Sequence, residues 1–335
     1  MRIVLIGVGA IGGSIAACLK KENYDITVVA KHQDYVDLIQ NEGLSITGVK
    51  GSFTQTMKAV ATIEELEGLY DIALIATKAY DVKESLIKLL PFLKDNSSVV
   101  SLQNGICTDI YEEIVGKDRS VGCVVGYGST MTQRGHIEIT STGNFVIGTI
   151  SKTFKGDLNV VKQCLSTTFE TEIVDNIYEF LYSKLIINSC ITSLGAITGI
   201  TLGEMMKHKS IRNLFLDIIK EATAVAIAKG IQIPPYGGKL NYYKLYHRNS
   251  KIGNFINHLI IKIVGKKYRH LKSSSLQSLE RGQKTEIDFF NGYIAKLGTE
   301  YKVPTPLNKA LVSMIKEIEN KTRTIDIKNI EEIHY

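Results

Sequence analysis

The glycines between Arg2 and Lys21, in the stretch RIVLIGVGAIGGSIAACLKK, constrain the fold more than any other feature. The apolar run 3–6 is typical of a strand buried on both faces. Glycines follow it in the order G-x-G-x-x-G, and a segment of helical composition comes next. In this context the first glycine permits a tight turn, the second lets the backbone approach a pyrophosphate, and the third lets the helix pack close to the strand. The motif predicts a dinucleotide site formed by Gly7, Val8, Gly9, Ala10, Ile11 and Gly12; a purely structural turn is the alternative.

The end of the second expected strand, DITVVAKH at 25–32, indicates which dinucleotide binds. An enzyme that uses NAD usually has Asp or Glu at this point to hold the ribose 2′-hydroxyl. This chain has Lys31, followed by His32. Since a cation attracts a 2′-phosphate that a carboxylate would repel, the sequence favours NADP(H) over NAD(H). A solvated lysine at a strand end is the alternative.

The rest of the N-terminal half alternates between expected strands and helices, which predicts a mostly parallel sheet. The strands are expected at 72–77, 99–103 and 121–125, and the helices at 63–68, 81–93 and 108–115. Two strands end in polar clusters, TKAYD at 77–81 and SLQNG at 101–105. Because ligands bind at the carboxyl ends of such strands, Lys78, Gln103 and Asn104 are placed to meet a cofactor or substrate. Residues 135–148 alternate like an antiparallel hairpin, which we expect to close the sheet.

Helical periodicity dominates after about residue 176, in the segments 178–199, 211–230, 285–301 and 307–321. The sequence therefore predicts an α/β protein with a Rossmann-type dinucleotide-binding domain at 1–175 and an all-helical domain at 176–335. We expect the chemistry to take place in a cleft between them. Lys184 and Asn188 share a helix face, although a snorkelling surface lysine would show the same spacing. Glu286 could equally be an exposed carboxylate near a helix start.

The composition and the spacing of the cysteines argue against a secreted or membrane-spanning protein. The chain is 44% hydrophobic with a net charge of +6, and its five cysteines are far apart, which is typical of reduced thiols in an intracellular protein. The apolar run at the start meets glycines at once, unlike a signal peptide, and no apolar stretch is expected to span a bilayer. Segment 236–272 has nine Lys or Arg and no Asp or Glu. It is interpreted either as a solvated helix pair with basic outer faces or as a surface that attracts an anion.

The ordered set of motifs resembles the ketopantoate reductase family over nearly the whole length. The set comprises GVGAIGG, the basic residue at 31, TKAYD, LQNG, the segment ending at Gly148, SKLIIN at 183–188, SSSLQSLERGQKTEIDFFNGY at 273–293 and VPTPLN at 303–308. The resemblance implies NADPH-dependent reduction of 2-dehydropantoate to pantoate, on the route to pantothenate and coenzyme A. It also implies a cytoplasmic enzyme without a metal ion.

The same resemblance assigns roles to individual residues. Lys184 matches the catalytic lysine, and Glu286 matches the acid that binds substrate. Asn104, Asn188, Thr192 and Ser274 match positions that line the active cleft, and Lys78 and Asn104 match positions near the cofactor. A lysine ammonium suits this reaction, because hydride addition to a ketone builds negative charge on oxygen that a positioned proton donor can neutralise.

Three positions depart from the pattern of the family. Tyr182 stands where many members have tryptophan, while Thr192 and Leu271 stand where asparagines are common. The resemblance implies that the last two positions touch the substrate pocket, so a relative acting on another branched 2-oxo acid is the first alternative. A non-catalytic NADP-binding sensor is the second, and the presence of Lys184, Asn188 and Glu286 argues against it. We expect no nucleic-acid partner, since no aromatic stacking platform accompanies the basic segment, and no membrane partner. A homodimer is compatible with the sequence.

Overall fold

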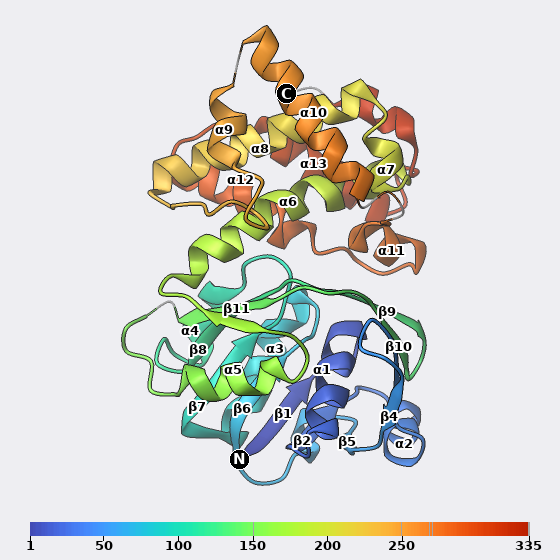
Figure 1. Cartoon of the computed structure of the whole chain (residues 1–335), viewed down its shortest axis with the longest axis vertical. Helices are drawn as coiled ribbons and strands as arrows, with labels where there is room; N and C mark the ends of the chain where they lie inside the picture. Colours follow the sequence, from blue (N-terminus) through green and yellow to red (C-terminus); the bar gives the residue numbers. More distant parts are fainter. Residues whose placement is uncertain (150, 249, 268, 270, 334–335) are drawn as a thin grey trace. The chain divides into compact units, whose positions relative to one another are not determined.

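The computed structural model describes residues 1–149, 151–248, 250–267, 269 and 271–333. These residues form two compact units, 1–181 and 182–335. The division falls inside helix α6 (Ile177–Thr198), a little beyond residue 175, where the sequence predicts it. Figure 1 shows strands and helices in the first unit and helices in the second.

The first unit is built on an eight-stranded sheet. Its order is β12 (Thr171–Ile173), β11 (Phe145–Thr149), β8 (Ser120–Val125), β7 (Leu93–Ser101), β6 (Tyr70–Ile75), β1 (Arg2–Ile6), β2 (Asp25–Val29) and β5 (Lys58–Val60). From β8 to β5 every neighbouring pair is parallel, and β11 joins β8 in antiparallel sense. The central strands are runs of Val, Ile and Leu, such as the nearly inaccessible residues 3–6 of β1, because both of their faces are covered. The predicted parallel sheet is confirmed.

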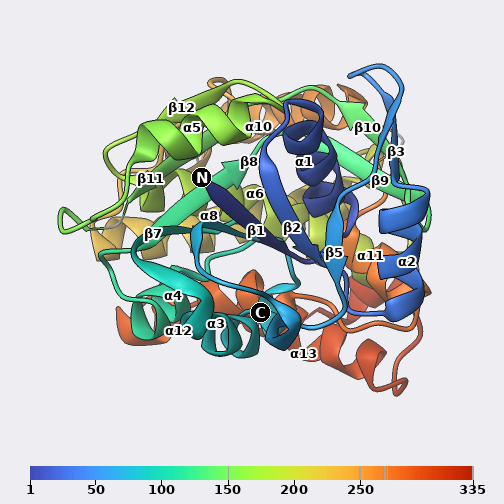
Figure 2. The same ribbon diagram turned by 90° about the horizontal axis from the view of Figure 1, so that it is seen from below.

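Helices lie on both faces of this sheet. They are α1 (Ala10–Lys21), α2 (Gln33–Asn41), α3 (Val82–Leu89), α4 (Thr108–Ile114) and α5 (Leu158–Ser166), with the 3₁₀ turns η1 (Ile63–Glu65), η2 (Ala79–Asp81) and η3 (Leu90–Phe92). Figure 2 shows α1 and α5 on one face and α3 and α4 on the other, which is the doubly wound arrangement. The helix expected at 63–68 is wrong beyond its first turn. The chain is already extended at Leu66, and it bends at Gly68, whose φ is 66°.

The hairpin expected at 135–148 is also wrong. Strand β10 (His136–Ser141) pairs with β9 (Gly128–Gln133) and β3 (Leu44–Gly48) in a second, four-stranded sheet completed by β4 (Phe53–Gln55), whereas β11 belongs to the main sheet. Between them the chain passes so close to Gly126 that a Cβ on Gly143 would lie 2.1 Å from the Gly126 carbonyl oxygen. The alternating pattern correctly indicates half-buried strands, but it does not specify their partners.

The second unit is helical, as predicted. Beyond α6 it contains α7 (Leu202–Met205), α8 (Lys209–Lys229), α9 (Tyr242–His247), α10 (Lys251–Lys267), α11 (Ser274–Glu280), α12 (Asn291–Glu300) and α13 (Pro306–Glu319), with 3₁₀ turns η4 (Ile287–Phe289) and η5 (Ile327–Glu332). Helix α8 ends at Gly230 in the left-handed conformation, and α13 begins with proline, both typical of helix ends. The Glu221 carboxylate of α8 accepts hydrogen bonds from the Leu307 and Asn308 amides at the start of α13.

Helix α6 bears on the expectation that no apolar stretch of this chain spans a bilayer. By length and composition it could cross a bilayer, contrary to the prediction that no stretch would. Within its most apolar window, however, 78% of the residues are buried. A mostly buried core helix passes the same test, so this helix is weak evidence for a membrane span.

Candidate active site

The glycine turn has the geometry that a dinucleotide requires. Gly7 has φ of 96°, and its amide donates to the Val29 carbonyl oxygen at 3.1 Å, which fixes the turn against β2. A Cβ on Gly12 would lie 2.1 Å from the Gly7 carbonyl oxygen and 2.9 Å from the Ala76 Cβ, so the helix can approach the strand only without a side chain there. A Cβ on Gly9 would meet nothing within 4 Å among the residues described. The surface beside Gly9 is therefore open.

The start of helix α1 leaves its amides available. Gly9 is the N-cap residue, no side chain caps the helix, and its first turn holds no acid. The second sheet holds this end of the helix in place: Ser129 Oγ donates to the Ala10 carbonyl oxygen at 3.1 Å, and Ser14 Oγ hydrogen-bonds to Tyr127 OH at 2.7 Å. Unpaired amides and the helix dipole favour an anion at such a terminus. Sequence reasoning missed this bracing, because it comes from residues more than a hundred positions away.

Lys31 lies two residues beyond the end of β2 and has an unusual backbone. Its φ of 68° is in the left-handed region, which few residues other than glycine adopt. The next amide, of His32, donates to the Ala30 carbonyl oxygen at 3.0 Å and closes a tight turn around Lys31. The side chain is exposed. Lys31 thus stands at the strand end where a ribose 2′-phosphate would need a cation.

The polar residues after β6 and β7 divide into two kinds. Gln103 is buried and fully hydrogen-bonded: Nε2 donates to the Ile75 and Thr77 carbonyl oxygens, and Oε1 accepts from Ser101 and Tyr111. The expectation that Gln103 meets a ligand is therefore wrong, because its amide joins the two strand ends. Lys78 and Asn104 are half-buried and lie after neighbouring parallel strands.

Thr77 is a candidate that the sequence analysis overlooked. Its Oγ1 is buried and has no hydrogen-bond partner among the residues described. Its amide nitrogen is 2.8 Å from the position of a Cβ on Gly7, so Thr77 borders the glycine turn. A buried hydroxyl without a partner is costly, which suggests that a ligand completes its hydrogen bonds. In the sequence, the signal that could have identified Thr77 was its position just beyond the buried strand β6.

In the second unit, a polar face runs along helix α6. Lys184, Asn188 and Thr192 follow one another at intervals of four residues, so they lie on one side of the helix. Lys184 and Asn188 are half-buried, and the residues around them, Leu185 and Ile186 among them, are fully buried. Lys184 therefore lies on a largely buried helix, unlike a snorkelling lysine on an exposed helix face. Thr192 is 4% exposed, and its Oγ1 has no hydrogen-bond partner among the residues described.

Helix α11 begins beside this polar face. Ser273 is its N-cap: Ser273 Oγ accepts from the Leu276 amide at 3.1 Å and donates to the Thr192 carbonyl oxygen at 3.4 Å. A Cβ on Gly195 would lie 2.6 Å from Ser273 Oγ, so the glycine permits this close approach. The residue that contacts Thr192 is thus Ser273, and the half-buried Ser274, predicted to bind substrate, is the residue that follows it.

Glu286 is a buried carboxylate, only 7% exposed, at the start of η4. The interpretation as an exposed carboxylate near a helix start is therefore wrong. Its neighbour Thr285 is anchored by Glu319 of α13, whose Oε1 accepts from the Thr285 amide and from Thr285 Oγ1, both at 2.6 Å. The Ile287 amide also donates to Thr285 Oγ1 at 3.2 Å. The backbone on both sides of Glu286 is thus fixed.

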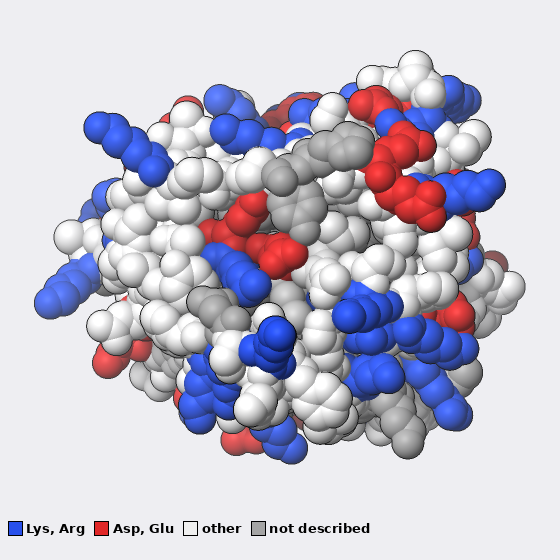
Figure 3. Space-filling view, turned by 90° about the horizontal axis from the view of Figure 1, so that it is seen from above, with Lys and Arg blue, Asp and Glu red and all other residues white. Residues whose placement is uncertain are grey.

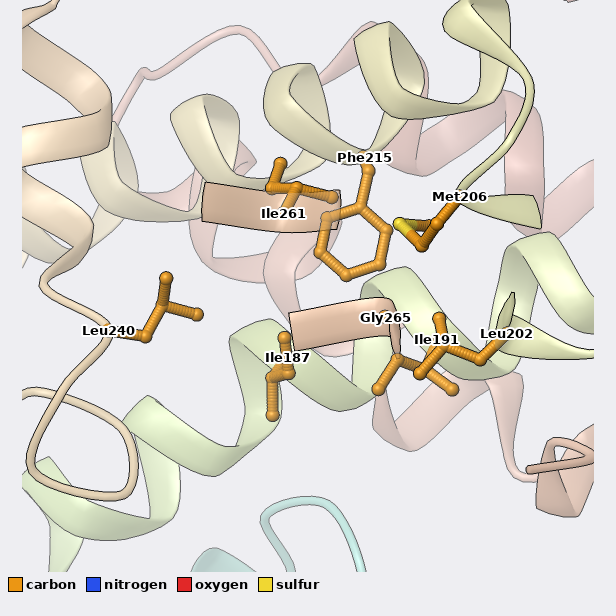
Figure 4. A pocket seen from close by; sticks show the side chains of 8 residues that line it. All are labelled: Ile187, Ile191, Leu202, Met206, Phe215, Leu240, Ile261 and Gly265. Carbon is orange, nitrogen blue, oxygen red and sulfur yellow. The ribbon is translucent and has the colours of Figure 1, made fainter. Parts of the chain in front are cut away.

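An apolar crevice and the absence of a metal-binding cluster among the described residues bear on where the oxo acid can bind. Figure 4 shows a crevice in the second unit lined only by apolar residues and glycine: Ile187, Ile191, Leu202, Met206, Phe215, Leu240, Ile261 and Gly265. With no donor for a carboxylate, it does not suit an oxo acid. In the described part of the chain, no group of three or more His, Cys, Asp or Glu could hold a metal ion. The five cysteines are buried as free thiols.

Known proteins resemble this chain along its length. The family model "Ketopantoate reductase PanE/ApbA" matches residues 3–152, and "Ketopantoate reductase PanE/ApbA C terminal" matches residues 176–319. The 2-dehydropantoate 2-reductase of Aquifex aeolicus is 27% identical over 325 residues, covering 95% of this chain and 97% of the relative.

Solved structures share the fold. A PanE/ApbA family ketopantoate reductase from Ralstonia eutropha superposes with a TM-score of 0.81 at 24% identity, covering 97% of this chain and all of that one. A D-mandelate dehydrogenase, solved with NADH and anilino(oxo)acetate, gives 0.82 at 20% identity and covers 96% of this chain and 99% of that one. Both family models match in order and leave few residues between them, so this chain belongs to the ketopantoate reductase family.

Proposed function

We propose that this protein reduces 2-dehydropantoate to pantoate with NADPH, on the route to pantothenate and coenzyme A. One observation carries the proposal: a half-buried lysine, an asparagine and a buried threonine share one face of a core helix in a member of the ketopantoate reductase family. The relatives named 2-dehydropantoate 2-reductase support this substrate. We also propose that the enzyme works in the cytoplasm and has no nucleic-acid or membrane partner.

The residues of the first unit fit an NADP(H) molecule. A side chain at position 9 would enter the open space beside Gly9, and the amides at the start of α1 have no side-chain cap. In this proposal residues 7–12 hold the pyrophosphate, the exposed Lys31 binds the 2′-phosphate, and Lys78, Asn104 and the unpaired Thr77 hydroxyl contact the rest of the cofactor.

The reaction needs a hydride and a proton. The bound cofactor supplies the hydride to the carbonyl carbon of the substrate. Lys184 stabilises the negative charge that develops on the carbonyl oxygen and donates a proton to it, a role typically worth about 10²–10⁴ in rate. Asn188, one helical turn along, orients the lysine or the carbonyl group.

The remaining residues select the substrate. Glu286 accepts a hydrogen bond from the substrate hydroxyl. Ser274 and the amides at the start of α11 bind the substrate carboxylate, and the Thr192 hydroxyl completes its hydrogen bonds with the substrate. A protein that only senses NADP(H) would have no need of this set.

The kinetics of two variants test these roles. Lys184→Ala should lower kcat by roughly 10²–10⁴-fold and leave NADPH affinity unchanged, because the cofactor residues lie in the other unit. Glu286→Ala should raise KM for the oxo acid as well as lower kcat, since a contact to a substrate hydroxyl exists before the transition state. Lys296→Ala, an exposed lysine on α12, is the matched control and should behave as the parent. Near-normal turnover by Lys184→Ala would remove this lysine from the mechanism.

Cofactor preference has its own test. Lys31→Asp should weaken NADPH binding and leave NADH binding nearly unchanged, because only NADPH has the 2′-phosphate. Fluorescence titrations of both cofactors measure this difference. If the parent binds NADH as tightly as NADPH, the NADP assignment is wrong.

A reductase of another branched 2-oxo acid is the second candidate. Thr192 and Leu271 replace the asparagines common in the family, and Leu271 is exposed on the second unit. A D-mandelate dehydrogenase, solved with NADH and anilino(oxo)acetate, has the same fold, so this fold accommodates substrates other than 2-dehydropantoate.

A further inference from the structure

Exposed cations form a large group in the second unit and a smaller one in the first. The large group lies in segment 236–272, and Figure 3 shows groups of Lys and Arg amid uncharged surface on the end of the unit where α9 and α10 lie. The same segment contains the α10 stripe, a row of exposed apolar side chains: Ile252, Phe255, Ile256, Leu259 and Ile263. The sequence interpretation of a basic outer face is thus incomplete, because the outer face of α10 is largely apolar. The smaller group, Lys31 and Arg134, lies at the start of α2.

The turn between β9 and β10 carries Arg134 onto helix α2. Figure 1 and Figure 2 both show these strands beside α1 and α2. A Cβ on Gly135, whose φ is 80°, would lie 2.6 Å from Leu38 Cδ2, so the turn packs closely on α2. Arg134 forms an ion pair with Asp34 in the first turn of that helix, one hundred positions earlier in the chain. The second sheet thereby places a guanidinium group at the start of α2.

This start of α2 is joined to the predicted dinucleotide site by two contacts. Lys31 lies three residues before Asp34, in the tight turn that links β2 to the helix. The buried Tyr35 donates through its hydroxyl to the Val8 carbonyl oxygen of the glycine turn at 3.1 Å. The guanidinium carbon of Arg134 lies 5.3 Å from the centre of the Tyr35 ring. Arg134 is therefore held over a side chain that is anchored to the glycine turn.

The ion pair between Asp34 and Arg134 is suited to exchange. The two side chains are 69% and 45% exposed, so water screens the pair and it contributes little to stability. A phosphate group has a charge of about −1.5 to −2 near pH 7 and three acceptor oxygens. A guanidinium group forms two parallel hydrogen bonds with it. Arg134 can therefore leave the Asp34 carboxylate for a phosphate while the Tyr35 ring still supports it.

We propose that Arg134 exchanges Asp34 for the 2′-phosphate of NADP(H) and so contributes to the choice of this cofactor over NAD(H). The inference rests on the proposed function, in which the 2′-phosphate lies at Lys31. The phosphate then binds a lysine from the end of β2 and an arginine from the second sheet. The second sheet thus serves both ends of the site, because it also braces the start of α1 through Ser129 and Tyr127.

Fluorescence titrations of the full-length protein with NADPH and NADH test the proposal, at low and at high salt. Arg134→Ala should weaken NADPH binding by about tenfold at low salt, because a charge-assisted hydrogen bond to the 2′-phosphate is lost. NADH binding should stay unchanged. The loss should shrink at high salt, since both charges are exposed and salt screens them. Arg134→Lys keeps the charge without the planar fork, so it should restore part of the affinity.

A gain-of-function variant and a control make the test sharper. Asp34→Asn should tighten NADPH binding by roughly twofold to fivefold without affecting NADH, because the competing carboxylate is removed. Lys155→Ala is the matched control, since this exposed lysine of the same unit pairs with Asp118 at 2.8 Å. Asp118 lies just before β8, at the amino end of the parallel strands, whereas ligands bind at their carboxyl ends. The control should bind both cofactors as the parent does.

The outcomes separate this inference from the proposed function. If the parent prefers NADPH and Lys31→Asp removes the preference, but Arg134→Ala leaves it intact, only the role of Arg134 is wrong. Equal weakening of NADPH and NADH by Arg134→Ala would indicate a contact with another part of the cofactor and would overturn the proposal. Weaker NADPH binding by Asp34→Asn would also overturn it, because the arginine would then need its carboxylate. A parent without preference for NADPH would overturn both the cofactor assignment and this inference.

Discussion

Gly9 and Gly12 lie three residues apart in the same turn, yet alanine should affect them in opposite ways. At Gly12 the new Cβ would lie 2.1 Å from the Gly7 carbonyl oxygen, so helix and strand must separate by more than 1 Å to restore normal contact. Overpacking of this kind costs about 1–3 kcal/mol, and the gain of about 1 kcal/mol in helix propensity offsets only part of it. At Gly9 the Cβ meets no described atom within 4 Å, and the backbone (φ −83°, ψ −163°) suits alanine. Loss of the glycine N-cap costs about 1 kcal/mol or less.

Gly9→Ala should mainly weaken NADPH binding, whereas Gly12→Ala should mainly lower the stability of the fold. In the proposed site the methyl group of Gly9→Ala occupies the space of the pyrophosphate. We therefore expect NADPH affinity to fall at least tenfold, about 1.4 kcal/mol, in a protein that unfolds close to the parent temperature. Gly12→Ala should lower the unfolding temperature by several degrees, at about 2–4 °C for each kcal/mol. Thermal unfolding by circular dichroism and titration of NADPH fluorescence measure the two quantities. A Gly9→Ala protein that binds NADPH as tightly as the parent would refute the placement of the pyrophosphate.

Two other predictions follow from the second unit. Glu319→Ala removes both hydrogen bonds to Thr285 and should loosen the backbone at Glu286. We therefore expect KM for the oxo acid to rise more than kcat falls, as measured by steady-state kinetics. If a denaturation curve shows lower stability while KM is unchanged, Glu319 has only a structural role. Burial and the nearby cations Arg212, Lys209 and Lys262 lower the pKa of His258. The unfolded chain then takes up its proton near pH 6.5 before the folded chain does, so this contribution to stability is complete above that pH and is lost as pH falls toward the folded pKa. The unfolding midpoint of His258→Gln should therefore drop less between neutral and mildly acidic pH than that of the parent, and equal drops would contradict the assignment.

The parts of the fold that depend on neighbouring residues were predictable from sequence. Strands β1 and β6 contain short apolar runs, and α6 and α8 have long helical periods. Both signals act within one element. The glycine turn was also predictable, because the packing of residues 7–12 is fixed by the two elements that they join.

Features that depend on distant contacts were not predictable. The second sheet unites segments 44–55 and 128–141, and alternation in 135–148 could not indicate that its two strands enter different sheets. Gln103 looked like a ligand contact, but its burial directs both ends of the amide into the structure. The charges of segment 236–272 were evident in the sequence, whereas the exposure of the α10 stripe depends on which face of that helix meets α7 and α8.

Steady-state NADPH oxidation by the parent protein with a panel of 2-oxo acids tests the central claim most directly. The account predicts that 2-dehydropantoate has the highest kcat/KM and that NADPH is preferred over NADH. Similar kcat/KM for a bulkier oxo acid would favour the second candidate. No turnover with any oxo acid, although NADPH binds, would contradict the assignment as a reductase.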